Sequence, residues 1–215
     1  MIDNSLEEYI TSHIDAEPPH LKKLNRDTHV SCLYANMCSG HEQGRLLKML
    51  VRMMKPRNIL ELGPFTGYSA QCLAEGMPEG GMVHTIEIND EMEEFIRQHL
   101  EESPYGDKIT LHVGDASQVL PSLDIEWDLV FIDANKRHYL DYYNMVFPMV
   151  RKGGFIIADN TLWYGKVTDS NAHDAQTEGI LRFNDFIQND PRVENVFIPV
   201  RDGLSIIYKL SLIHL

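Results

Sequence analysis

Residues 59–69 decide the fold, and they read I-L-E-L-G-P-F-T-G-Y-S. The first four residues predict a short buried strand, and Gly63 and Gly67 predict a tight turn from that strand into a helix. Glycines let a ligand approach the backbone, and the free N–H groups at a helix N-terminus attract an anion. The spacing matches neither the dinucleotide pattern G-x-G-x-x-G nor a phosphate loop that ends in Gly-Lys-Ser/Thr. A plain strand–helix turn therefore stays open for this segment alone.

The chain on either side alternates between helical and strand patterns. Residues 1–57 are expected to be helical, because apolar residues from Leu46 to Met54 recur every three to four positions until Pro56. The strands predicted downstream cover residues 83–88, 109–113, 128–132, 155–158, 196–200 and 204–209. The helices predicted between them cover residues 69–76, 90–102, 116–120, 139–150 and 177–189.

This alternation, with continuous apolar strands, is typical of a mainly parallel α/β sheet covered by helices on both faces. The last two strands are joined by residues 201–203, a turn too short for a parallel crossover, so this pair is expected to be antiparallel. An open α/β sheet binds its ligand beyond the carboxyl ends of its strands. Functional residues are therefore expected just after each strand.

Single acidic residues follow the second and third predicted strands. Glu87 stands 24 residues after Gly63, about where an acidic residue holds a ribose diol in such folds. An exposed strand-end acid is the alternative, but the glycine turn upstream favours the nucleoside interpretation. Asp115 suits either an adenine amino group or the cap of the next helix.

Three oxygen-bearing side chains follow the fourth and fifth predicted strands: Asp133, Asp159 and Asn160. Such hard ligands suit Mg²⁺, Ca²⁺ or Mn²⁺. Without a cation, facing carboxylates repel one another, although Lys136 supplies one compensating charge and a salt-bridge cluster is the alternative. Trp163 lies just beyond and could either stack on a planar substrate or pack in the core.

Composition narrows the class of protein. The 215 residues include 19 Lys and Arg against 32 Asp and Glu, and the net charge of −13 argues against a broad nucleic-acid-binding face. No apolar run approaches the roughly 18 residues that span a bilayer, and the polar, acidic start predicts no secretory signal. The three irregularly spaced cysteines predict neither a disulfide framework nor a zinc site, which favours a reduced, cytoplasmic setting.

The motifs together resemble the cation-dependent class I S-adenosylmethionine O-methyltransferases, the family of catechol and caffeoyl-coenzyme A O-methyltransferases and their small bacterial relatives. The resemblance runs from about residue 25 to residue 210. It rests on an ordered set of segments: M-C-S-G-H-E-Q-G-R-L-L, E-L-G-P-F-T-G-Y-S, T-I-E-I-N, F-I-D-A-N-K-R-H-Y, A-D-N-T-L-W-Y-G, D-P-R-V-E and I-P-V-R-D-G-L.

The resemblance implies a Rossmann-like α/β fold with a seven-stranded, mostly parallel sheet of order 3-2-1-4-5-7-6, whose last strand is antiparallel. It implies a single domain over residues 1–215, in which the N-terminal helices, about 1–57, cover the cofactor pocket. The implied S-adenosylmethionine site contains Met37, Ser39, Glu61, Gly63, Tyr68, Ser69, Glu87, Asp115, Ala116 and Asp133. The implied ligands of a divalent cation, Mg²⁺ first and otherwise Ca²⁺ or Mn²⁺, are Asp133, Asp159 and Asn160. Lys136 matches the family's general base with Asp133 beside it, and Trp163 and Asp202 fall where substrate contacts lie.

The implied reaction is cation-dependent methyl transfer from S-adenosylmethionine to a catechol-like vicinal diol on a small phenolic molecule, by an enzyme that is expected to be a homodimer. Three departures from the family pattern, Pro64, Asn135 and Arg201, bear on the substrate more than on the chemistry.

Three other functions compete with this one. The same chemistry could methylate a hydroxylated uridine in transfer RNA, for which Lys22, Lys23 and Arg26 are the compact N-terminal basic cluster. A non-catalytic S-adenosylmethionine-binding protein is a second alternative, although it would not need the set of Asp133, Lys136, Asp159 and Asn160. A nicotinamide oxidoreductase is disfavoured because G-x-G-x-x-G is missing.

Overall fold

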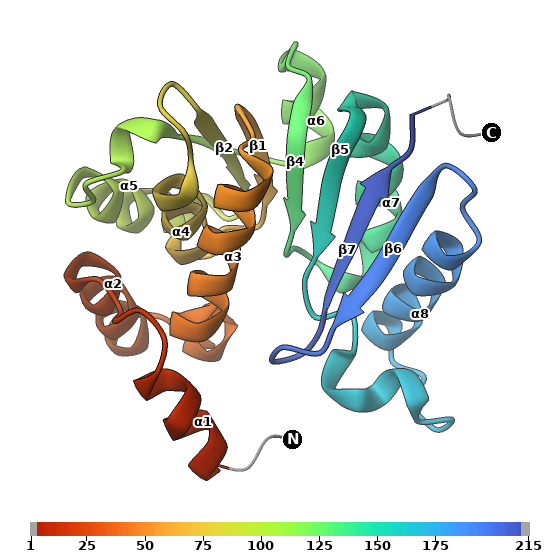
Figure 1. Ribbon diagram of the computed structural model, residues 1–215, viewed down its shortest axis with the longest axis horizontal. Coiled ribbons are helices and arrows are strands. Elements are labelled where there is room, and N and C mark those ends of the chain that lie inside the picture. The colour runs from red at the N-terminus through yellow and green to blue at the C-terminus, as the bar shows by residue number, and fades with distance from the viewer. Residues whose placement is uncertain (1–3, 212–215) are drawn as a thin grey trace.

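The computed structural model describes residues 4–211, which contain one seven-stranded sheet of order β3-β2-β1-β4-β5-β7-β6 (Figure 1). Strands β1 to β5 pair with one another in parallel, and β7 runs antiparallel to both β5 and β6. The predicted strand order and the antiparallel last strand are confirmed.

The strands are β1 (Asn58–Leu62), β2 (Met82–Glu87), β3 (Ile109–Val113), β4 (Trp127–Ile132), β5 (Val150–Ala158), β6 (Val193–Ile198) and β7 (Leu204–Lys209). The α-helices are α1 (Asn4–Ser12), α2 (Pro19–Ser31), α3 (Gly40–Met54), α4 (Tyr68–Gly76), α5 (Glu93–Glu101), α6 (Ala116–Val119), α7 (Tyr139–Val146) and α8 (Ala175–Gln188). Short 3₁₀ helices cover Ala35–Met37, Asp90–Met92, Gly106–Lys108, Leu120–Ser122, Lys136–His138, Phe147–Met149 and Trp163–Thr168.

Prolines explain three of the boundaries of the observed helices and strands. The helix predicted over 139–150 is wrong beyond Val146, because Pro148 lacks an N–H and disfavours a helical conformation in the residue before it. Strand β6 starts at Val193 and ends before Pro199, which cannot donate to a sheet ladder. The N-terminal helical region is divided at Pro18, which precedes a proline at the first position of α2.

The sheet separates two apolar layers. Ile59 of β1 packs with residues of helices α2 to α5, whereas Leu60 and Leu62 pack on the other face with residues of α7 and α8. Figure 1 shows α3, α4 and α5 on one side of the sheet and α7 and α8 on the other. Both faces are therefore covered, and the strand ends stay open for a ligand. None of the helices in the described part of the chain is long and apolar enough to cross a membrane.

Candidate active site

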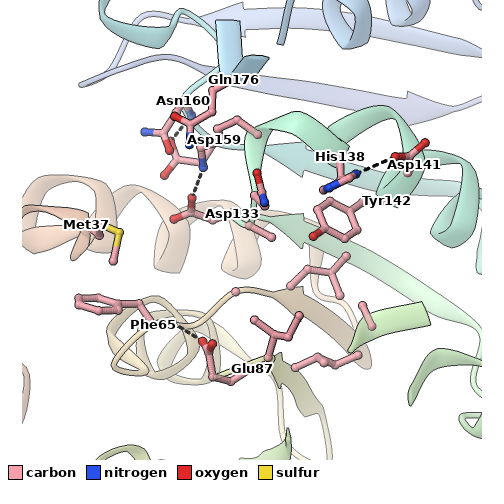
Figure 2. Close-up of a pocket in the computed structure, with 18 of the residues that line it drawn as sticks. Met37, Phe65, Glu87, Asp133, His138, Asp141, Tyr142, Asp159, Asn160 and Gln176 are labelled. Atoms are coloured by element: carbon pink, nitrogen blue, oxygen red, sulfur yellow. Dashed lines mark hydrogen bonds and ion pairs between the residues drawn. The ribbon is translucent and has the colours of Figure 1, made fainter. Parts of the chain in front are cut away.

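A cavity of roughly 730 Å³ opens at the carboxyl ends of the parallel strands. Its walls are the segments that follow β1 to β5, together with Asn36 and Met37 from the N-terminal region and Arg201 and Asp202 from the turn between β6 and β7. Figure 2 shows Glu87 on one side of this cavity and Asp133, Asp159 and Asn160 on the other. The residues after the strands therefore do line one cavity, with Glu87 on one side and the other acids opposite, and their binding of a ligand stays a prediction.

Glu87 forms a rigid acceptor at the end of β2. Only 7% of the residue is exposed; one carboxylate oxygen accepts from the Asn89 N–H (2.9 Å) and the other from the Phe65 N–H (3.2 Å). Burial raises the pKa of this carboxyl group. Each carboxylate oxygen has a second lone pair, so the oriented group can still accept from a ligand diol.

Gly63 brings the end of β1 against the end of β4. Its φ is +88°, and a Cβ atom at this position would lie 2.1 Å from the carbonyl oxygen of Asp133. A side chain at residue 63 is therefore excluded by both conformation and space. The following turn places Phe65 in the cavity wall, as Figure 2 shows.

Asp115 and Ala116 line the cavity after β3. The Asp115 carboxylate also accepts from the backbone N–H and the hydroxyl of Ser117, at 2.7 and 2.6 Å, and so caps α6. The capping interpretation is confirmed, and contact with an adenine stays a prediction.

Asp133, Asp159 and Asn160 come together from the ends of β4 and β5. Asp159 is 2% exposed, and its two oxygens accept from the Gln43 amide (2.6 Å) and from the Asn160 N–H (2.7 Å). Burial, with the nearby charge of Asp133, raises the pKa of Asp159 to about 7. Among residues 4–211, no group of three His, Cys, Asp or Glu side chains could hold a metal ion, so this site consists of two carboxylates and an amide.

Lys136 lies beside these carboxylates. Its Nζ is 2.6 Å from Asp133 Oδ1 and 2.8 Å from the Tyr139 hydroxyl, which donates to the Asp159 carbonyl oxygen at 2.9 Å. Lys136 is 7% exposed and Tyr139 is fully buried. The ion pair that the sequence left open is present, and Tyr139 fixes the ammonium group between the two strand ends.

The third wall of the cavity is the loop after β5. Asn160, Trp163 and Tyr164 all have positive φ values, of 55°, 44° and 54°, in a region that L-residues seldom occupy. The Tyr164 N–H donates to one oxygen of Asp202. Within the described residues, the other Asp202 oxygen and the Trp163 indole N–H are buried without a hydrogen-bond partner. Buried polar atoms of this kind suit contacts with a ligand.

Four predicted cofactor residues stand outside the cavity lining: Ser39, Glu61, Tyr68 and Ser69. Glu61 is fully buried and accepts from the Thr85 hydroxyl at 2.5 Å. The Tyr68 hydroxyl donates to Glu17 at 2.7 Å. All four residues are buried, and their contact with a cofactor stays a prediction.

Sequence reasoning missed several cavity residues. His138, Asp141, Tyr142 and Met145 all line it, and their spacing of three, one and three residues is that of one helix face. That periodicity could have identified them. Gln43 lies outside the cavity lining but donates to Asp159, and it was also missed, although a glutamine on the same helical face as Leu47 and Leu50 is a polar residue on a buried face.

Comparisons with known proteins agree with this geometry. A family model described as O-methyltransferase matches residues 10–210. The caffeoyl-CoA O-methyltransferase of Petroselinum crispum is 31% identical over 224 residues, covering 97% of this chain and 92% of that protein. The corresponding enzyme of Eucalyptus gunnii is 30% identical over 222 residues, covering 97% and 89%.

Solved structures of similar proteins have the same architecture. The O-methyltransferase TomG of Streptomyces achromogenes, involved in tomaymycin synthesis and solved in complex with SAM, has a TM-score of 0.89 at 30% identity, covering 97% of each chain. The SAH-bound methyltransferase PaMTH1 of Podospora anserina has a TM-score of 0.89 at 26% identity, covering 97% of this chain and 95% of that one. The chain therefore belongs to the O-methyltransferase family and is an S-adenosylmethionine-dependent O-methyltransferase.

Proposed function

We propose that this enzyme is cation-dependent and methylates one hydroxyl of a vicinal diol on a small phenolic acceptor. The observation that carries the proposal is the buried group of Asp133, Asp159 and Asn160 at one end of the cavity, with Lys136 beside it.

The side of the cavity that contains Gly63 and Glu87 fits a nucleoside with a charged tail. Gly63 leaves room at the backbone, Glu87 presents oriented oxygens for the ribose hydroxyls, and Asp115 and Ala116 stand where an adenine would lie. S-Adenosylmethionine supplies an electrophilic methyl group on its sulfonium. The protein's task is to hold an acceptor oxygen in line with that methyl group.

The acidic end fits a hard divalent cation. Asp133 and Asp159 face one cavity, and the raised pKa of Asp159 reflects its burial and the repulsion between the two groups. Asn160 adds a neutral oxygen, which completes a donor set that suits Mg²⁺ or Mn²⁺. A divalent cation here supplies the Lewis-acid charge that favours a phenolate over a phenol.

Lys136 is the proton acceptor in this proposal. Its Nζ borders the cavity and is oriented by Asp133 and by the Tyr139 hydroxyl. The role requires the neutral amine, which a bound divalent cation would favour by repelling the ammonium charge. Trp163 and Tyr164 line the same cavity and offer aromatic surface to a planar ring.

A small phenol is a better acceptor for this structure than transfer RNA. Lys23, at the centre of the N-terminal basic cluster, is paired with Asp27 (2.9 Å) and Glu102 (2.8 Å). The cluster is therefore partly neutralised by the protein itself. We further propose a homodimer from the family resemblance, and a cytoplasmic location from that resemblance and the three free cysteines.

The decisive experiment measures transfer of a labelled methyl group from S-adenosylmethionine to caffeic acid, with Mg²⁺ and then with EDTA. p-Coumaric acid, which has a single phenolic hydroxyl, is the matched control. We expect turnover of caffeic acid that requires the cation and little turnover of the control. Equal rates with Mg²⁺ and with EDTA, or no preference for the diol, would contradict the proposal.

A further inference from the structure

Hydrogen bonds through one buried glutamine connect the turn between β6 and β7 to the acidic end of the cavity. Gln43, in the first turns of α3, is 1% exposed. Its Nε2 donates to Asp159 Oδ2 at 2.6 Å, and its Oε1 accepts from Arg201 Nη1 at 3.0 Å. The same Arg201 nitrogen donates to the carbonyl oxygen of Ser39. Three segments far apart in the sequence therefore meet at this side chain.

The partners of Gln43 fix the direction of its amide. A guanidinium has only donors and an ionised carboxylate has only acceptors. The amide oxygen must therefore face Arg201 and the amide nitrogen must face Asp159. A flipped amide would place an acceptor against Asp159 and a donor against Arg201, so this link has one stable orientation.

Arg201 maintains this link from a strained backbone position. Its φ is +50°, in the left-handed region that disfavours L-residues. Such a conformation persists where the surrounding contacts hold it, and it is concentrated at functional sites. The contacts here are the two acceptors on and beside α3, the Ser39 carbonyl and the Gln43 amide.

We propose that Gln43 and Arg201 are positioning residues that aim the Asp159 carboxylate at the cation site. This inference rests on the proposed cation-dependent function. Asp159 accepts one hydrogen bond at each oxygen, from Gln43 and from the Asn160 N–H, so the carboxylate cannot rotate and each oxygen keeps a further lone pair. Because Arg201 also binds the Ser39 carbonyl, the cation site and the segment that carries Met37 are held together.

The test uses Mn²⁺ as the probe and needs no turnover. Mn²⁺ binding to the whole protein is followed by electron paramagnetic resonance, S-adenosylmethionine binding by calorimetry, and stability by thermal unfolding. Because loss of an outer-sphere partner weakens metal binding about 10- to 100-fold, we expect a weakening of this size in Gln43→Met. Arg201→Gly should weaken Mn²⁺ binding in the same direction without lowering Tm, because glycine relieves the strained φ. Arg201→Lys, which keeps a donor, should recover part of the affinity.

The matched control is Gln71→Met. Gln71 is also 1% exposed, but its amide atoms have no hydrogen-bond partner among the described residues. The control should leave Mn²⁺ affinity unchanged, and Gln43→Met and Gln71→Met should both bind S-adenosylmethionine within about twofold of the wild type.

The results separate this inference from the function on which it rests. Mn²⁺ binding by the wild type that is lost in Asp159→Asn supports the cation site itself. Unchanged Mn²⁺ affinity in Gln43→Met or Arg201→Gly would then overturn only the positioning role, as would an equal loss in Gln71→Met. Failure of the wild type to bind Mn²⁺ would overturn both proposals.

Discussion

Gly63 and Asp133 are in backbone contact across the junction of β1 and β4, so close that a Cβ atom on residue 63 would lie 2.1 Å from the Asp133 carbonyl oxygen. Asp133 lines the cavity at this point, and Gly63 opens the turn on the proposed cofactor side. The spacing between the two proposed halves of the site therefore requires that residue 63 has no Cβ atom.

Gly63→Ala should disturb both halves of the site. Gly80→Ala is the matched control, since Gly80 has a similar positive φ of +74° but no atom within 4 Å of its Cβ position. Overpacking should lower the free energy of unfolding by about 1–3 kcal/mol more in Gly63→Ala than in the control, and should weaken S-adenosylmethionine binding. Urea unfolding and calorimetry measure the two effects. Equal losses in the two variants would show that backbone strain alone matters.

Glu87→Gln should weaken cofactor binding. Glutamine keeps the shape of the side chain but has only one acceptor oxygen, so it cannot hold the Phe65 and Asn89 N–H groups and also accept two ribose hydroxyls. Because hydrogen bonds to charged groups contribute about 1.5–3 kcal/mol, the Kd for S-adenosylmethionine should rise roughly 10- to 100-fold. Exposed Glu79→Gln is the control. An unaltered Kd in Glu87→Gln would move the ribose contact elsewhere.

Asp159→Asn should abolish stimulation of turnover by the cation while leaving cofactor affinity intact. The substitution keeps the size of the side chain and removes the charge of one of the two facing carboxylates, so a divalent cation loses its main attraction to this end of the cavity. Initial rates with Mg²⁺ and with EDTA, measured beside calorimetric binding of S-adenosylmethionine, test this. Wild-type stimulation by Mg²⁺ in the variant would refute the assignment of Asp159.

Glu61 should make stability depend on pH. Burial raises its pKa from 4.5 to about 7, so between these values the folded state keeps a proton that the unfolded chain has released. The unfolded state then binds fewer protons, and the free energy of unfolding falls as pH rises through this range. Glu61→Gln removes this dependence and still offers Thr85 an acceptor.

The pH at which the variant is compared decides the size of its effect. The free energy of unfolding of Glu61→Gln, relative to that of the wild type, should rise by roughly 2–3 kcal/mol from pH 5 to pH 8, because of the raised pKa of Glu61. Urea unfolding at the two pH values measures this difference. The same difference between variant and wild type at both pH values would mean that Glu61 does not carry the titration.

The sequence predicts those parts of the site that strand ends position. Glu87, Asp133 and Asp159 each end or directly follow an apolar run, and parallel strands place such residues at one edge of a sheet. The turn at residues 201–203 likewise predicts an antiparallel pair from its length alone. The sheet order itself came from the family resemblance.

Contacts between distant segments could not be predicted in this way. Helical periodicity places Gln43 on a buried face but cannot name its partner Asp159, which lies 116 residues away. The Arg201 contact with Ser39 spans 162 residues and depends on a positive φ, which an arginine in a sequence does not predict. Tertiary packing, and not local propensity, decides such pairs.

The two ends of the cavity have separate origins in the chain, and this separation makes the enzyme open to redesign. The proposed cofactor end is built by β1 to β3 and their turns, whereas the far end takes part of its outer wall from Trp163, Tyr164 and Asp202. The residues of this outer wall can be exchanged or randomised while the sheet and the proposed cofactor end stay unchanged. Libraries confined to these three positions keep Asn160 and Arg201, which the proposed cation site needs, and are the natural route to new acceptors on the same scaffold.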